Sequence, residues 1–202
     1  MVLRILRSWS GQASNLRLEG DQVYLRPIQD RDWRAWSEIR RDSRAFLEPW
    51  EPLWPPDALS RLTFRRRLDQ AMDELRSETA YPLHIMRRND DQLLGGVTMS
   101  NVRRGVAQSA TLGYWIGEPF ARKGHMTDAL HCVAVFAFDR VGLHRLEAAC
   151  LPSNEPSRRV LQKVGFQQEG YARGYLRING HWHDHLLFGL LADDWRRRRE
   201  RR

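Results

Sequence analysis

Hydrophobic and polar residues recur along the chain at two spacings, and each spacing predicts its own kind of element. Apolar residues at every second position are typical of strands, whereas apolar residues three and four apart are typical of amphipathic helices. The first spacing predicts a strand over residues 23–27, and runs of residues beside turn signals predict further strands over residues 81–88, 93–100, 108–116, 145–150, 171–178 and 181–191. The second predicts helices over residues 59–78, 124–138 and 156–164, and a fourth after Asp30 that carries Trp33, Trp36 and Ile39.

Turn-forming and capping residues separate these elements. Asp30 is expected to cap the first helix, because its carboxylate can accept a hydrogen bond from the first turn. The segment Phe46–Pro56 is rich in Pro and Trp, which predicts a loop, and residues 89–91 (Asn-Asp-Asp) predict a turn. Gly165 is expected to end the last helix. Asn179-Gly180 is the strongest hairpin signal in the chain.

The connections between these elements predict an α/β (α+β) fold. The order is β-α-α-β-β-β-α-β-α-β-β, with about seven strands and four helices. Three successive strands joined by short turns favour antiparallel pairing, whereas the strand–helix–strand unit after Gln108 favours a parallel pair with a crossover helix. We therefore expect a mixed, mostly antiparallel sheet that is flanked by helices.

Length and composition restrict the class of protein. The chain has 202 residues, 42% hydrophobic and 29% charged, so one globular domain is expected and wholesale disorder is excluded. Cys132 and Cys150 are too few for a disulfide framework or a four-thiolate zinc site. No apolar run approaches the roughly 20 residues of a membrane span. The N-terminus lacks the apolar core of a secretory signal, so we expect a cytoplasmic protein with no membrane partner.

Positive charge gathers at the C-terminal end. The formal net charge is +8, and residues 196–202 contribute six arginines and one glutamate to it. We divide the chain into an N-terminal extension over residues 1–20, a domain over residues 21–195 and an arginine-rich tail over residues 196–202. The tail is expected to be a frayed, solvated terminus. A contact with RNA or another polyanion is the alternative.

The turn after the strand that ends at Ile116 is the most informative local feature. Residues 117–127 read Gly-Glu-Pro-Phe-Ala-Arg-Lys-Gly-His-Met-Thr and lead into a helix. Such a turn presents unpaired backbone N–H groups, and the helix dipole adds positive potential. With Arg122 and Lys123 this predicts a site for a phosphate or pyrophosphate. A plain loop is the alternative, because the turn lacks a Gly-rich fingerprint.

A second turn and several short motifs give the chain a resemblance to a known family. Residues 152–159 (Pro-Ser-Asn-Glu-Pro-Ser-Arg-Arg) follow a strand and precede a helix that ends in Val164-Gly165-Phe166. Together with the phosphate turn, this resembles the GNAT superfamily of N-acetyltransferases, and within it the RimJ-type ribosomal-protein alanine N-acetyltransferases. The further motifs that resemble the RimJ type lie at residues 46–52, 100–102, 112–117, 144–145, 169–172 and 182–185.

The resemblance implies a GNAT fold in which two parallel strands splay apart and hold acetyl-CoA. It implies that the backbone at Trp115, Ile116 and Gly117 lies along the pantetheine arm, as an added strand lies along a sheet edge. The residues that it implies for the pyrophosphate are Arg122, Lys123, Gly124, His125, Met126 and Thr127, and those for the pantetheine are Asn154, Ser157 and Arg158. Ala121 departs from the family, which usually has Gln or Arg there. A helix N-cap alone is the alternative for Asn154.

Three residues are candidates for proton transfer. Glu169 stands where the resemblance implies a general base, and an exposed strand carboxylate is the alternative. Cys150 stands where it implies a group that protonates the leaving CoA thiolate, and a small buried residue is the alternative. Tyr175 and Tyr171 are further candidates for the acid. We expect direct attack in a ternary complex, because no His or Asp is placed to activate Cys150 as a nucleophile.

Residues 46–54 are expected to form one wall of the acceptor site. Trp50 is the expected contact within it, and Tyr171 is a second expected contact. Glu48 and Glu51 carry negative charge that would attract an ammonium group. The alternative is that the tryptophans of this segment are core aromatics beneath a loop.

The resemblance implies an enzyme that acetylates the N-terminal alanine of a ribosomal protein, most simply one of the small subunit. Acetylation of lysine or of a small amine is one alternative, and a non-catalytic module that binds acetyl-CoA or the ribosome is another. The tail would then contact the ribosome or its RNA, and the protein would be a monomer or a weak homodimer. His181, His183 and His185 share one face of a strand. No further ligand accompanies them, so we expect no metal.

Overall fold

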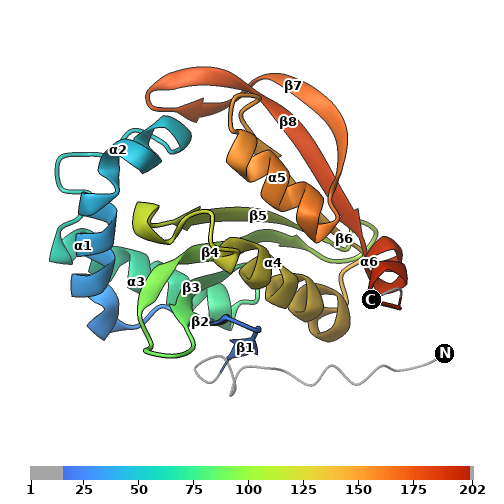
Figure 1. The fold of residues 1–202 in the computed structure, drawn as a ribbon, viewed down its shortest axis with the longest axis horizontal. Coiled ribbons are helices and arrows are strands. Elements are labelled where there is room, and N and C mark those ends of the chain that lie inside the picture. The colour runs from blue at the N-terminus through green and yellow to red at the C-terminus, as the bar shows by residue number, and fades with distance from the viewer. Residues whose placement is uncertain (1–15, 201–202) are drawn as a thin grey trace.

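The computed structural model describes residues 16–200 and shows one sheet in the order β1-β2-β3-β4-β5-β6-β8-β7 (Figure 1). All neighbouring strands are antiparallel except β5 and β6, which are parallel. The strands are β1 (Leu18–Glu19), β2 (Val23–Pro27), β3 (Tyr81–Arg87), β4 (Leu93–Arg103), β5 (Ser109–Ile116), β6 (Arg145–Cys150), β7 (Gln167–Ile178) and β8 (His181–Leu191). The predicted mixed sheet is confirmed, with the short β1 as an addition.

Helices cover both faces of the sheet. The helices are α1 (Trp33–Asp42), α2 (Arg44–Leu47), α3 (Arg61–Arg76), α4 (His125–Val135), α5 (Glu155–Val164) and α6 (Ala192–Glu200). On one face α4 and α5 cover the main core (Figure 1), which includes Leu130 and Leu161. A second core contains Trp36 of α1 and Phe64 of α3. None of the helices within residues 16–200 is both long and apolar enough to span a bilayer.

Left-handed residues produce two of the predicted changes in chain direction. Asn179 and Gly180 have φ values of 43° and 82°, and they join β7 to β8. Positive φ at both central residues is the requirement of a tight hairpin turn whose twist matches the strands. Gly165 has a φ of 117° and ends α5. Both predictions are confirmed.

The start of α1 differs from the prediction. Asp30 lies inside a 3-10 turn instead of capping the helix, and Asp32 is the N-cap residue of α1. The Asp30 carboxylate pairs with Arg61 of α3. The buried Asp32 carboxylate accepts hydrogen bonds from Arg26 and His84. Tertiary ion pairs have therefore taken both carboxylates that could have capped the helix.

The segment 46–56 is partly helical, so the predicted continuous loop was wrong. Its first residues belong to α2, and a 3-10 turn follows over Glu48–Trp50. Pro49 lies in the first turn, where a missing N–H leaves no helical hydrogen bond unmade. A proline that looks like a helix breaker in the sequence is thus compatible with the start of a short helix.

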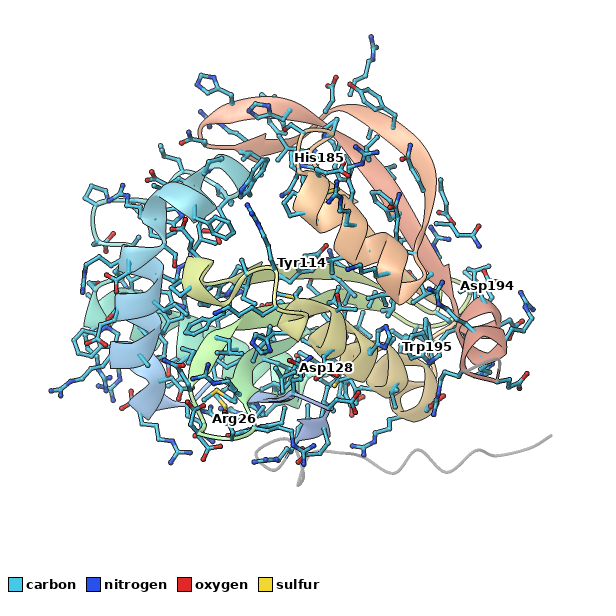
Figure 2. The ribbon with its side chains drawn as sticks, in the orientation of Figure 1. Arg26, Tyr114, Asp128, His185, Asp194 and Trp195 are labelled. Carbon is cyan, nitrogen blue, oxygen red and sulfur yellow. The ribbon has the colours of Figure 1, made fainter. Side chains whose placement is uncertain are left out.

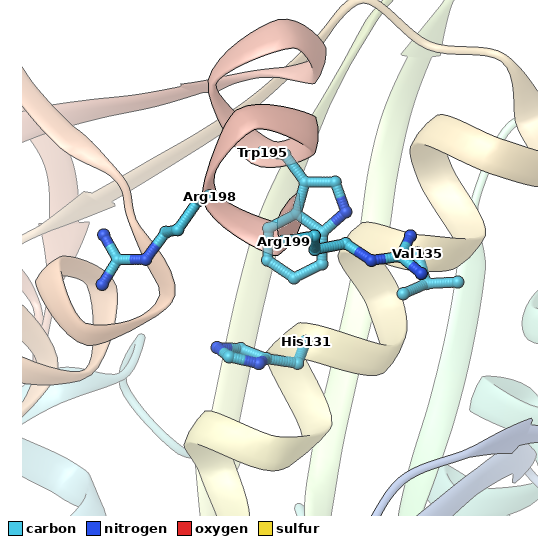
Figure 3. Close-up of a pocket in the computed structure, with 5 residues that line it drawn as sticks. All are labelled: His131, Val135, Trp195, Arg198 and Arg199. Atoms are coloured by element: carbon cyan, nitrogen blue, oxygen red, sulfur yellow. The ribbon is translucent and has the colours of Figure 1, made fainter. Parts of the chain in front are cut away.

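The arginines near the C-terminus are part of α6 and bind neighbouring groups. Trp195 of α6 is buried and lies edge-on to His131 of α4, and both line the pocket of Figure 3. Four arginines have partners: Arg196 with Asp193, Arg197 with Asp194, Arg198 with the carbonyl of Lys163, and Arg199 with Asp139. The first two bonds lie within α6, and the last two tie the helix to the rest of the domain. A contact between the tail and RNA stays a prediction.

Candidate functional site

The parallel strands β5 and β6 separate part-way along their length. They pair from Ser109 and Arg145 as far as Leu112 and Ala148. Beyond that point β5 continues to Ile116 with only β4 beside it, while β6 keeps β8 as its partner from Arg145 to Cys150. Residues 113–116 therefore have a strand neighbour on one side alone within the described sheet. Peptide groups on such an edge can pair with an extended ligand, and the role of Trp115 and Ile116 along the pantetheine arm stays a prediction.

The turn that follows β5 exposes the first backbone N–H groups of α4. Arg122 and Gly124 have left-handed φ values of 61° and 88°, and Gly124 begins the helix without a side-chain cap. The first backbone bond of the helix runs from the N–H of Asp128 to the carbonyl of Gly124, at 3.0 Å. The N–H groups of residues 125–127 precede it, so they are free to bind an anion together with the helix dipole.

His125 adds a second feature to this turn. The residue is buried, and its Nδ1 has no hydrogen-bond partner within residues 16–200. Burial lowers the pKa of His125, and the positive charges of Arg87 and Lys123 lower it further. The imidazole is therefore neutral near pH 7. An unpartnered buried nitrogen beside free N–H groups fits a ligand that supplies the missing hydrogen bond.

A chain of three polar side chains crosses the opening between β5, β6 and α5. The Tyr114 hydroxyl lies 2.7 Å from Oγ of Ser157. Ser157 is also near enough to the Cys150 thiol to act on its pKa, which it lowers against the larger effect of burial. Asn154 caps α5 by accepting a hydrogen bond from the Ser157 backbone N–H at 3.1 Å. Burial raises the pKa of both Tyr114 and Cys150, so both keep their protons near pH 7. This group can donate a proton, and Figure 2 labels Tyr114 within it.

Tyr114 is the member of this group that sequence reasoning missed. It lies in an apolar strand, where a tyrosine is common. Only its contact with Ser157 in the folded structure suggests a role in proton transfer. Alternation along β5 was the available signal, because Tyr114 packs with the α4–α5 core while Trp115 packs with the other core. The end of β5 thus presents one aromatic residue to each face of the sheet.

Glu169 is held by an ion pair. Both of its carboxylate oxygens accept hydrogen bonds from Arg145, the first residue of β6. These bonds lower the pKa of Glu169. Glu169 lies in a bulge of β7 that is opposite Phe188 and Leu187, and its side chain passes over Gly189 toward Arg145. Its backbone is therefore level with the end of the β5–β6 pairing, while its carboxylate points toward the start of β6.

The predicted acceptor residues lie in two places, the segment at the end of α2 and the β7–β8 hairpin. Glu48 pairs with Arg44 on the surface of α2, and Trp50 is half-buried. Tyr171 is exposed and donates a hydrogen bond to Asp184 of the β7–β8 hairpin. Tyr175, the alternative acid, is also exposed and lies edge-on to His185. The structure brings none of these four side chains into the Tyr114–Ser157–Cys150 group.

Glu51 makes the more informative contacts of this segment. Arg40 of α1 binds the Glu51 carboxylate with two nitrogens, and the Trp54 indole donates to the same carboxylate at 2.8 Å. The carbonyl of Glu51 accepts a hydrogen bond from the N–H of Asn179, at 2.8 Å. The tip of the β7–β8 hairpin is therefore hydrogen-bonded to the segment that follows α2. Figure 1 shows this end of the hairpin above α2.

A comparison with protein families decides what this arrangement is. The family model described as "Acetyltransferase (GNAT) domain" matches residues 22–167. The chain belongs to the GNAT family of acetyltransferases. It is an acetyl-CoA-dependent N-acetyltransferase, and its splayed β5–β6 pair is the feature of the GNAT fold that the resemblance implied.

Several relatives of this GNAT enzyme are similar over nearly the whole chain. The ribosomal protein uS5-alanine N-acetyltransferase of Escherichia coli is 33% identical over 189 residues, 92% of this chain and 97% of the relative. RimJ of Mycobacterium smegmatis, in complex with CoA-disulfide, has a TM-score of 0.82 and 36% identity, with 89% of this chain and 87% of that chain covered. Ribosomal-protein-S5-alanine acetyltransferase of Vibrio fischeri has a TM-score of 0.82 and 30% identity, covering 89% and 98%.

The residues of the GNAT site fit acetyl-CoA. The unpaired edge at residues 113–116 suits the amide-bearing arm, and the free N–H groups at the start of α4 suit the pyrophosphate. Arg122 and Lys123 make no ion pair with a carboxylate within residues 16–200, so their charges are available for phosphate. No group of three His, Cys, Asp or Glu side chains in the described part of the chain is placed to hold a metal.

Proposed function

We propose that this enzyme acetylates the N-terminal alanine of a ribosomal protein. The observation that carries the proposal is similarity along almost the whole chain to an enzyme named for the alanine of ribosomal protein uS5. The opposite directions of two neighbouring aromatic side chains on β5 also support the proposal. Tyr114 faces the side of α4 and α5, where acetyl-CoA fits, and Trp115 faces the side of α1 and α3, which leaves that side for the acceptor.

The chemistry needs little from the protein beyond placement and two proton transfers. Acetyl-CoA supplies an acetyl group that its thioester has already activated. The acceptor ammonium first gives one proton to a base. The neutral nitrogen then forms a bond to the acetyl carbon as the carbon–sulfur bond breaks. The nitrogen loses its second proton to solvent, and the departing sulfur receives a proton. Ser157, with Tyr114 behind it, is placed on the donor side to supply that last proton. Burial keeps the Cys150 thiol protonated, and no His, Asp or Glu of residues 16–200 acts on its pKa, which supports direct attack over an acetyl-cysteine route.

Glu169 is the proposed base, and Arg145 is proposed to hold it until an acceptor enters. We expect Glu169→Gln to lower kcat/KM about tenfold at pH 7, because an α-amine with a pKa of about 8 is roughly one-tenth neutral there. Since Arg145 lowers the pKa of Glu169, the acid limb of the rate profile lies below the ordinary carboxyl range. Arg145→Gln raises that pKa and shifts the acid limb to higher pH. Steady-state rates from pH 3 to 9 measure both effects.

Glu147 provides the matched control for this test. It also accepts a hydrogen bond from Arg145, but it lies within β6 instead of the β7 bulge. Glu147→Gln should therefore leave the rate and its acid limb within twofold of the parent. A Glu169→Gln enzyme with the parent rate at every pH would remove Glu169 from the mechanism.

The acceptor class is tested with two peptides and mass spectrometry. One peptide has a free N-terminal alanine and no lysine, and the other has a blocked N-terminus and internal lysines. We expect acetyl transfer to the first alone, because its amine is partly neutral at physiological pH whereas a lysine amine has a pKa near 10.4. Transfer to the second alone would replace the proposal by lysine acetylation. Binding of acetyl-CoA without transfer to either would favour a small-amine acceptor or a binding module.

A further inference from the structure

Arg67 of α3 is a cation without an anionic partner. Its guanidinium lies over the Trp36 ring, 5.4 Å from the centroid. The side chain is exposed to solvent, and it makes no hydrogen bond or ion pair with any residue from 16 to 200. A guanidinium offers five N–H donors, and here all five are left for water or a ligand.

A second arginine adds to the excess of positive charge beside Trp36. Arg40 of α1 is buried and lies over the same Trp36 ring, 5.6 Å from its centroid. The nearby carboxylate is Glu51, and it already accepts two hydrogen bonds from Arg40 and one from Trp54. Two positive charges therefore share one carboxylate, and its hydrogen bonds go to Arg40 and Trp54 instead of Arg67. A further negative group beside Arg67 would relieve the repulsion between the arginines.

The surroundings of Arg67 strengthen this argument. Partial desolvation lowers the pKa of Arg67, and repulsion from Arg40 lowers it further, whereas Glu51 acts in the opposite direction. The charged form of Arg67 is thus disfavoured by Arg40, and no hydrogen-bonded anion within residues 16–200 offsets that repulsion. Arginine is suited to such a place, because its planar fork binds a carboxylate with two parallel hydrogen bonds.

These arginines lie on the acceptor side of the sheet. The Arg40 guanidinium also lies 4.8 Å from the Trp115 ring and 4.4 Å from the Trp54 ring. Trp115 belongs to the open edge of β5, and Glu51 bonds to the hairpin tip through Asn179. The Arg67 cation therefore belongs to the same cluster as the open edge and the expected acceptor wall.

We propose that Arg67, supported by Arg40, forms a subsite for a carboxylate side chain of the acceptor peptide, beyond its N-terminal residue. This inference rests on the proposed N-terminal acetyltransferase activity and adds to it a preference for acidic N-terminal segments. The bound carboxylate accepts two hydrogen bonds from Arg67. The acceptor amine then lies nearer to Trp115 and the open edge.

The test compares lysine-free peptides that begin with alanine. Three of them carry one glutamate, at the second, third or fourth position, and a fourth peptide has glutamine at all three positions. For at least one glutamate position we expect kcat/KM to exceed that of the glutamine peptide about tenfold, the effect of a charge-assisted bidentate contact at a solvent-accessible site. In Arg67→Gln the preference should disappear while the glutamine peptide keeps its parent rate. Arg67→Lys should keep part of the preference.

Arg66→Gln is the matched control. Arg66 is the neighbouring exposed arginine of α3, so its substitution removes the same charge from the helix. It should retain the full preference, which separates a local contact from the general positive field of the helix. Thermal unfolding of all three variants confirms that the fold is kept. Equal rates for all four peptides, or a preference that survives Arg67→Gln, would overturn the subsite alone. Absence of acetylation of every alanine peptide would instead overturn the proposed function, and the subsite with it.

Discussion

Replacing Gly124 with valine is expected to weaken acetyl-CoA binding about 100-fold. Gly124 has a φ of 88°, a conformation that a β-branched residue scarcely adopts. Valine therefore moves the turn out of the left-handed region and displaces the free N–H groups at the start of α4. Losing two charge-assisted hydrogen bonds to phosphate accounts for an effect of this size. Isothermal titration with acetyl-CoA measures it directly.

Gly142 makes the comparison specific. It has a φ of 77° at the end of the turn that follows α4, and a Cβ there would meet no atom within 4 Å. A Cβ at Gly124 would meet only the side chain of Gln22, at 3.3 Å, so neither position is crowded by backbone. Gly142→Val therefore introduces similar backbone strain beyond the opposite end of α4 from the phosphate turn. If both variants lose acetyl-CoA affinity equally, the turn is not the phosphate site.

The fold was largely predictable because its information is local. The alternation that predicted β3 to β6, and the Asn179-Gly180 turn between β7 and β8, depend on residues close together in the sequence. The errors occurred where distant partners decide. Asp30 would cap a helix in isolation, yet Arg61 binds its carboxylate. The helix over the C-terminal arginines forms with Trp195 buried beneath it, and a run of arginines gives no sign of that burial.

The candidate site also combines local features, which the sequence can predict, with contacts between distant segments, which it cannot. The proposed phosphate turn is a backbone feature of one segment, so the sequence alone could predict a phosphate site at Gly124 and its neighbours. The Tyr114–Ser157–Cys150 group joins three elements, and the Arg40–Glu51 pair joins a helix to the segment after α2. No spacing along the chain encodes these contacts. Sequence reasoning identified Cys150 and Ser157 singly, and it could not see that Tyr114 connects to them.

The Tyr114–Ser157–Cys150 group leads to the second large prediction. We expect Ser157→Ala to lower kcat about 100-fold with little change in the KM for acetyl-CoA, within the usual range for loss of a general acid. The substitution keeps the cap of α5, because Asn154 accepts from the backbone N–H of residue 157 and not from its hydroxyl. Pre-steady-state measurement of acetyl transfer separates this loss from slow product release.

Two further variants identify which group gives the proton to the departing sulfur. Tyr114→Phe keeps the ring in the core and removes the hydroxyl 2.7 Å from Ser157, so it should lower kcat by about tenfold if Tyr114 replenishes the Ser157 proton. Cys150→Ala removes the thiol and should leave kcat within threefold, because a buried thiol with a raised pKa acts there as a small packing residue. A 100-fold loss in Cys150→Ala with a normal Ser157→Ala enzyme would reverse the assignment and make Cys150 the acid.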